Sequence, residues 1–139
     1  MNNLKALGRH ILVEYYNCDL EILKDPTFIE REMNQAALAA EATVVESKFH
    51  HFSPWGVSGA ILIAESHLTI HTWPEYGFAA VDFFTCGDLD PWESFAYLEK
   101  VLKAEFCESV EIPRGLMAKF REHGGVDRGE MSYKLERKM

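Results

Sequence analysis

One stretch of the sequence, Glu65 to Asp88, holds most of the side chains that could do chemistry. It reads ESHLTIHTWPEYGFAAVDFFTCGD and contains a serine, two histidines and a cysteine. Serine and cysteine can act as nucleophiles, and histidine can move protons near neutral pH. Which of these reactions is feasible depends on which of the groups the fold brings together.

A β-hairpin is the structure that this stretch predicts. Two runs of β-branched and aromatic residues flank the sequence PEYG at 74–77, whose proline and glycine favour a turn. Pairing the residues next to this turn places Ser66 opposite Thr85, or opposite Cys86 if one bulge shifts the register. Because cross-strand neighbours have Cβ atoms about 5 Å apart, Ser66 and Cys86 are expected to be neighbours.

His71 is expected to lie far from Ser66 of its own chain. Five residues of extended strand span about 16 Å, and the odd spacing puts the two side chains on opposite faces. Either the strand bends sharply after Ser66, or His71 serves the Ser66 of a second chain across a two-fold interface. We favour the second arrangement.

Two other kinds of site fit the sequence poorly. His67 and His71 would share a face of the strand, but about 13 Å of strand is too long for one zinc ion with bonds near 2 Å. The segment Gly56-Val57-Ser58-Gly59 lacks the final glycine of a G-x-S-x-G nucleophile elbow, because residue 60 is alanine. Neither a metal site nor a serine hydrolase is therefore favoured.

The whole sequence alternates strand and helix patterns. Asp25-Pro26 and Asp90-Pro91 each supply an N-cap followed by a proline suited to the first helical turn. We expect helices at 26–42 and 91–105, and strands at 10–16, 43–52, 60–64, 68–73, 78–86 and 110–112. This order predicts an α+β two-layer sandwich, with a mostly antiparallel β-sheet and both helices on one face. The other face is rich in aromatic residues, so two chains could pair there as a four-layer αββα dimer.

Composition narrows the class of protein. The 139 residues fit one domain, and 14 Lys and Arg against 22 Asp and Glu give a net charge of -8, unlike a nucleic-acid binder. No apolar run is long enough for a signal peptide or a membrane span, so a cytoplasmic protein with no membrane partner is expected. The three cysteines form no C-x-x-C pair and are expected to be reduced. Residues 115–139 are charged and aperiodic, and predict a weakly ordered tail.

Several segments together resemble one known family. The sequence ESH at 65–67, followed by LTIHTWPEYG and then FTCGDLDP at 84–91, resembles the prokaryotic pyruvoyl-dependent S-adenosylmethionine decarboxylases. The resemblance extends over most of the chain, through LGRH at 7–10, GVSG at 56–59 and IPRG at 112–115.

This resemblance implies a proenzyme that cuts itself between Glu65 and Ser66. Ser66 Oγ would attack the Glu65 carbonyl, and elimination from the resulting ester followed by hydrolysis would leave a pyruvoyl group. The products would be a β chain of residues 1–65 and an α chain of residues 66–139. The pyruvoyl group would form a Schiff base with the substrate amine, with neither a metal nor PLP.

The resemblance also implies a role for each site residue. The assignments are His71 as the base of the elimination, Ser58 as a hydrogen-bond donor to the oxyanion, Cys86 as the proton donor in decarboxylation, Phe52 against the adenine, and Glu75 on the ribose hydroxyls. An unperturbed thiol is mostly protonated at neutral pH, which suits a proton donor. No role is assigned to His67.

The predicted activity is decarboxylation of S-adenosyl-L-methionine to S-adenosyl 3-(methylsulfanyl)propylamine and CO2, for polyamine (spermidine) biosynthesis. A homodimer of cleaved protomers, with active sites at the interface, would carry it out. Two alternatives remain open: an ornithine or arginine decarboxylase on the same scaffold, and a homologue that binds a ligand but never cleaves. Taken singly, Ser66, His71 and Cys86 could each be ordinary packed residues.

Overall fold

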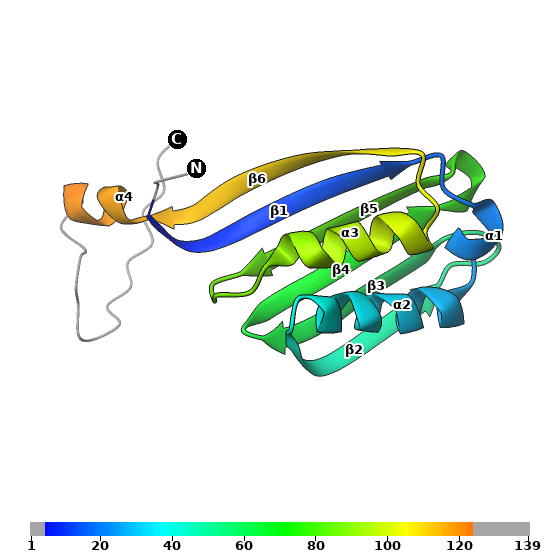
Figure 1. Cartoon of the computed structure of the whole chain (residues 1–139), viewed down its shortest axis with the longest axis horizontal. Helices are drawn as coiled ribbons and strands as arrows, with labels where there is room; N and C mark the ends of the chain where they lie inside the picture. The colour runs from blue at the N-terminus through cyan, green and yellow to red at the C-terminus, as the bar shows by residue number, and fades with distance from the viewer. Residues whose placement is uncertain (1–4, 124–139) are drawn as a thin grey trace.

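Six antiparallel strands form one sheet in the computed structural model, which describes residues 5–123 (Figure 1). The strands are β1 (Ala6–Tyr16), β2 (Thr43–His51), β3 (Val57–Ala64), β4 (Ser66–Trp73), β5 (Phe78–Thr85) and β6 (Phe106–Leu116). Their spatial order is β2-β3-β4-β5-β1-β6. The helices are α1 (Leu20–Leu23), α2 (Pro26–Ala39), α3 (Pro91–Val101) and α4 (Met117–Glu122), with a 3-10 turn η1 (Pro74–Tyr76).

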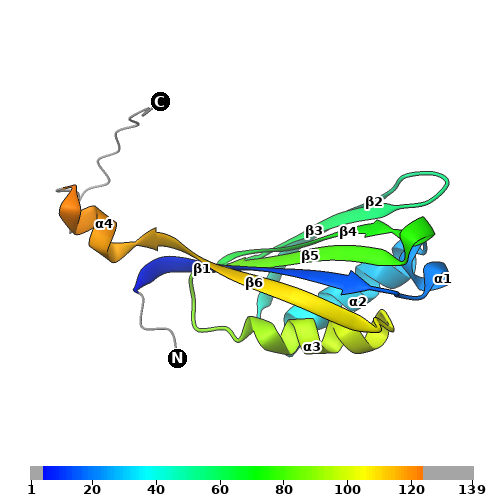
Figure 2. The ribbon, with the colours of Figure 1, turned by 90° about the horizontal axis from the view of Figure 1, so that it is seen from above.

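Helices α2 and α3 cover the same face of the sheet (Figure 2). Both begin as the sequence predicts: the Asp25 and Asp90 carboxylates accept hydrogen bonds from backbone N–H groups of the first turn, and a proline follows each. The two-layer α+β sandwich with a mostly antiparallel sheet and both helices on one face is therefore confirmed.

The hydrophobic core lies between the sheet and these helices. Along each central strand every second side chain points into it, as with Ile11, Val13 and Tyr15 of β1 and Leu68 and Ile70 of β4. The intervening side chains lie on the surface that α2 and α3 do not cover, which we call the open face. It carries, among others, His10, Leu12, Ser58, Leu62, His67, Thr69, His71, Trp73, Asp82 and Phe84.

The hairpin register agrees with the sequence prediction. Trp73 pairs with Phe78 across η1, and the ladder continues without a bulge until Ser66 pairs with Thr85. Gly77 closes the turn with a φ of +63°, and a Cβ there would lie 3.2 Å from the Cys18 carbonyl oxygen, so a side chain would be both strained and crowded.

Four strands, β1, β3, β4 and β6, are longer than predicted. β3 begins at Val57, so the GVSG segment lies mostly within a strand and forms no nucleophile elbow. β6 runs for 11 residues, although it contains Pro113 and Gly115 and its side chains are mostly exposed on both faces. An edge strand tolerates proline, and exposure on both faces removes the alternation that reveals a strand in sequence.

Regular structure continues beyond Gly115, where the sequence predicted a weakly ordered tail. Strand β6 reaches Leu116, and α4 follows directly. The remainder of the predicted tail, 124–139, lies outside the described residues. No helix within residues 5–123 is long and apolar enough to cross a membrane.

Candidate active site

Ser66 lies at the tip of the tight hairpin that joins β3 to β4. Ile63 pairs with Ser66, so only Ala64 and Glu65 form the loop. The peptide bond between Glu65 and Ser66 therefore lies at one end of the sheet rather than within a strand. Ser66 has a φ of +149°, which L-residues rarely adopt, and strained backbone of this kind clusters at functional sites.

Cys86 follows β5 and contacts the residue that precedes Ser66. Its Sγ lies 3.6 Å from the Glu65 carbonyl oxygen and 3.4 Å from the Glu65 carboxylate Oε1. The expected proximity of Cys86 to position 66 is thus present, and the thiol can donate a hydrogen bond to the carbonyl that Ser66 would attack.

A cleft of about 700 Å³ opens beside Cys86, and we call it the Cys86 cleft. Its lining includes Leu7, Gly8, Arg9, Thr85, Cys86 and Glu111. Arg9 donates two hydrogen bonds to the Glu111 carboxylate, at 2.6 and 3.1 Å. These bonds hold the pKa of Glu111 below its usual value despite an opposing effect of burial.

The other two cysteines lack such surroundings. Cys18 is buried, and burial raises the pKa of its thiol to about 11, so it carries almost no thiolate near neutral pH. Cys107 is exposed on the edge strand β6, and partial desolvation raises its pKa as well. All three thiols are free, as expected from the sequence.

The remaining predicted site residues gather at another place. Ser58 and His71 face each other across the β3–β4 ladder, and Ser58 Oγ lies 2.8 Å from His71 Nδ1. A second cleft, of about 330 Å³, is lined by Phe52, Ser58, His71 and Glu75 together with Trp55 and Trp73. We call this the His71 cleft. Four of the predicted residues therefore share one cleft.

Within residues 5–123, the two clefts have no lining residue in common. Ser66 and His71 stand at opposite ends of one continuous strand, about 16 Å apart at the usual rise per residue. The exposed His71 lies on the open face, whereas the fully buried Thr85, the partner of Ser66, points toward the helices. The predicted site residues thus fall into two separate groups within one chain, which we call the half-sites.

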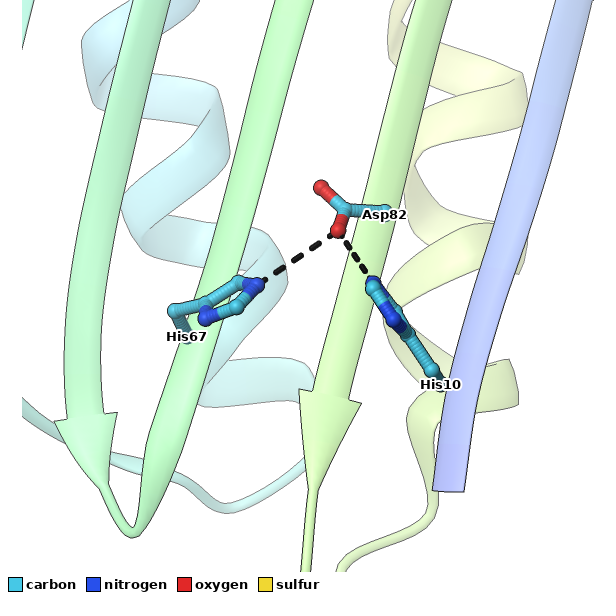
Figure 3. A group of neighbouring side chains, drawn as sticks. All are labelled: His10, His67 and Asp82. Atoms are coloured by element: carbon cyan, nitrogen blue, oxygen red, sulfur yellow. Dashed lines mark hydrogen bonds and ion pairs between the residues drawn. The ribbon is translucent and has the colours of Figure 1, made fainter. Parts of the chain in front are cut away.

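A third cluster was not predicted from the sequence. Asp82 of β5 lies between His10 of β1 and His67 of β4 on the open face (Figure 3). Its Oδ2 is 2.5 Å from His10 Nε2 and 3.4 Å from His67 Nε2, and its Oδ1 accepts a hydrogen bond from Thr69. The alternation of side chains along each strand could have shown which residues share a face. Bringing His10 next to Asp82 also requires the β1–β5 register, which the sequence does not reveal.

Hydrogen bonding indicates the tautomer of His10. Arg114 can only donate, and it lies 2.9 Å from His10 Nδ1, so that nitrogen accepts and Nε2 carries the proton given to Asp82. Burial raises the pKa of Asp82, but hydrogen bonds from His10 and Thr69 and the nearby imidazoles lower it further, to below its usual value. The potential ligand atoms lie within 4.8 Å of one another, yet a protonated His10 Nε2 is not a metal ligand.

Comparison with known sequences assigns a family to this arrangement. Residues 9–115 match the family model described as S-adenosylmethionine decarboxylase. A curated S-adenosylmethionine decarboxylase proenzyme from Thermotoga petrophila is 58% identical over 113 residues, 81% of this chain and 87% of the relative. One from Caldanaerobacter subterraneus subsp. tengcongensis is 56% identical over 117 residues, 84% and 94% of the two chains.

A solved structure has the same fold. The adenosylmethionine decarboxylase from Aquifex aeolicus matches with a TM-score of 0.76 at 31% sequence identity. The match covers 93% of this chain and 99% of the Aquifex chain. The matched residues of the family model, 9–115, include Ser66, His71 and Cys86.

Proposed function

The chain belongs to the S-adenosylmethionine decarboxylase family, and we propose that it is a proenzyme that cleaves itself at Ser66 and then decarboxylates S-adenosylmethionine. One observation carries this proposal beyond the family match: Cys86 Sγ lies 3.6 Å from the Glu65 carbonyl oxygen, beside the peptide bond to be cut. The product would be the decarboxylated sulfonium amine, an aminopropyl donor for polyamine synthesis.

Self-cleavage begins with attack of Ser66 Oγ on the Glu65 carbonyl carbon. The C–N bond breaks, the Ser66 nitrogen takes up a proton, and an ester joins Glu65 to the Ser66 side chain. Cys86 donates a hydrogen bond to the oxygen that becomes negatively charged during this attack. This contact adds a processing role for Cys86 to the proton-donor role expected from the sequence.

Elimination then separates the two chains. A base removes the Ser66 α-proton, the Glu65 carboxylate leaves as the new C-terminus, and water replaces the enamine nitrogen, which departs as ammonia. The terminal ketone supplies an electron sink that no encoded side chain offers. His71 is the proposed base, and its contact with Ser58 orients the imidazole.

In this proposal a second copy of the chain supplies His71 to Ser66, because the two half-sites do not meet within one chain. We propose that two open faces pack together, so that the hairpin tip with Ser66 of one protomer reaches the His71 cleft of its partner. The open face carries exposed apolar side chains suited to such contact: Leu12, Leu62, Trp73, Val110 and Ile112. The result is the four-layer αββα homodimer.

The His71 cleft has groups suited to the nucleoside part of the substrate. Phe52 is 53% exposed, and its ring can stack on adenine for about 1 kcal/mol. Glu75 can accept hydrogen bonds from the ribose hydroxyls. The net charge of -8 favours a sulfonium cation over an anionic substrate.

Intact mass and a substrate panel test the proposal. Purified protein should convert to chains of residues 1–65 and 66–139, the second with a pyruvoyl end, whereas Ser66→Ala should remain one chain. Cleaved protein should release CO2 from S-adenosylmethionine and not from ornithine or arginine. A wild-type chain that stays intact would favour a binding homologue, and activity on ornithine or arginine alone would refute the substrate.

Cys86 variants test the proposed contact with Glu65. Cys86→Ala should slow cleavage about tenfold, which corresponds to one hydrogen bond of roughly 1.4 kcal/mol to the developing oxyanion. Cys86→Ser keeps a donor and should cleave faster than Cys86→Ala. Equal cleavage rates for wild type and Cys86→Ala would remove this role.

A further inference from the structure

We propose that the Asp82 cluster anchors His67 and thereby fixes the chain end that self-cleavage creates at residue 66. The inference rests on the proposed function, and it gives a role to the one reactive side chain of the 65–88 stretch that the two half-sites leave unused. Asp82, His10 and Thr69 act here as positioning residues, through His67, and not on the substrate.

Cleavage removes two of the restraints on residue 66. Before it, Ser66 is joined covalently to Glu65 and pairs with Ile63 on one side and Thr85 on the other. Afterwards the bond to Glu65 is gone, and the residue has lost its backbone nitrogen, so it can no longer donate a ladder hydrogen bond. A chain end with so few restraints frays unless another contact holds it.

His67 is the first residue that keeps its full set of contacts. Its backbone pairs with Leu62 of β3 and with Phe84 of β5. Its Nε2 lies 3.4 Å from Asp82 Oδ2, and its ring packs 5.8 Å from the Phe84 ring and 5.9 Å from the His10 ring. Holding this ring also holds the peptide group to which the pyruvoyl carbonyl is attached.

The anchor itself is rigid because each member is bonded further. Thr69 donates to Asp82 Oδ1, which leaves Oδ2 for the two imidazoles. Arg114 donates to His10 Nδ1, and its guanidinium lies 5.8 Å from the centre of the Phe84 ring. Figure 3 shows Asp82 reaching both histidines from the strand between them.

Anchoring should therefore matter in the cleaved protein and much less in the proenzyme. In the intact chain the hairpin tip restrains residue 66 from both sides, so loss of the His67 side chain leaves the attacking geometry nearly unchanged. After cleavage the reactive carbonyl is joined covalently to the fold only through His67. A small displacement of a reacting group costs a large factor in rate.

The test compares His67→Ala, His67→Gln and wild type in two assays. His67→Ala should cleave within about twofold of the wild-type rate, but its kcat for decarboxylation should fall at least tenfold, with a smaller change in KM. Gln carries an N–H close to the position of His Nε2, so His67→Gln should recover most of the lost kcat. His51→Ala, which removes an exposed imidazole on β2, is the matched control and should resemble wild type.

Hydrogen exchange separates an anchor from a general structural role. In cleaved His67→Ala, amides 67–69 should exchange at least tenfold faster than in cleaved wild type. On the uncleaved Ser66→Ala background, adding His67→Ala should change the same amides by no more than about twofold. The anchor would be overturned if His67→Ala accelerated amide exchange equally in the cleaved and uncleaved proteins. It would also be overturned if His67→Ala lowered the cleavage rate and kcat by the same factor, or left kcat at the wild-type value. A wild type that never cleaves would overturn the proposed function as well, whereas a normal His67→Ala enzyme would overturn the anchor alone.

Discussion

Co-expression of Ser66→Ala protomers with His71→Ala protomers should restore self-cleavage that neither variant shows alone. In a mixed dimer, the Ser66 of the His71→Ala chain faces the intact His71 of its partner. The other site has lost both residues. Each mixed dimer therefore contains one complete site and one empty site.

The expected yield follows from the geometry of β4. Five residues of straight strand separate the two side chains by about 16 Å, so rescue requires the partner's imidazole. Random pairing of equal amounts makes about half of the dimers mixed, and each mixed dimer cleaves one chain. About half of the His71→Ala chains, and none of the Ser66→Ala chains, should yield a pyruvoyl-blocked α chain.

Separate tags and tandem purification isolate the mixed dimer, and intact mass counts the cleaved chains. The pair Ser58→Ala with His71→Ala is the control: both residues line the same cleft, so a mixed dimer has no complete site and should not cleave. An isolated mixed dimer of Ser66→Ala and His71→Ala without any cleaved chain would refute the shared site.

Three stability predictions apply to the uncleaved Ser66→Ala background, with all variants compared at the same protein concentration. Because the folded pKa of Asp82 is depressed, its carboxylate stabilises the fold above the unfolded pKa near 3.8, and that stability is lost as pH falls through the folded pKa. Urea unfolding should show Asp82→Asn about 1–3 kcal/mol less stable at pH 7, with the gap closing in acid; a pH-independent gap would contradict this. Tyr15→Phe leaves the buried Phe95 carbonyl without its 2.8 Å donor and should cost about 1–3 kcal/mol in the same assay. Gly59→Ala would place a Cβ 1.9 Å from the Phe49 ring and should cost about 1–3 kcal/mol, part of which Phe49→Leu restores; no cost in either variant would contradict the packing.

Local signals in the sequence were enough for the starts of α2 and α3 and for the main hairpin. The Asp-Pro pairs fix where α2 and α3 begin, because each supplies a cap and a preset φ within two residues. The turn at 74–77 fixes the β4–β5 register, and with it the closeness of position 66 to Cys86. Simple strand geometry also separates His71 from Ser66.

Long-range pairing could not be read in the same way. β1 inserts between β5 and β6, and no local pattern states that these segments meet. The Asp82 cluster depends on this insertion, because His10 reaches Asp82 only in the β1–β5 register. β6 was predicted too short because its exposed faces, Pro113 and Gly115 hide the strand pattern.

The strand order has a consequence for the life of the cleaved protein. The proposed cut assigns β1, β2 and β3 to one fragment and β4, β5 and β6 to the other, yet β1 lies between β5 and β6. The fragments are therefore interlaced in one sheet and cannot part without breaking three ladders, β3–β4, β5–β1 and β1–β6. Before the cut, the sheet forms by folding of a single chain. After the cut, refolding requires two fragments to associate, so the yield of refolding depends on their concentration. The mature enzyme would thus be maintained by a slow rate of unfolding, because the fold forms readily only while the chain is uncut.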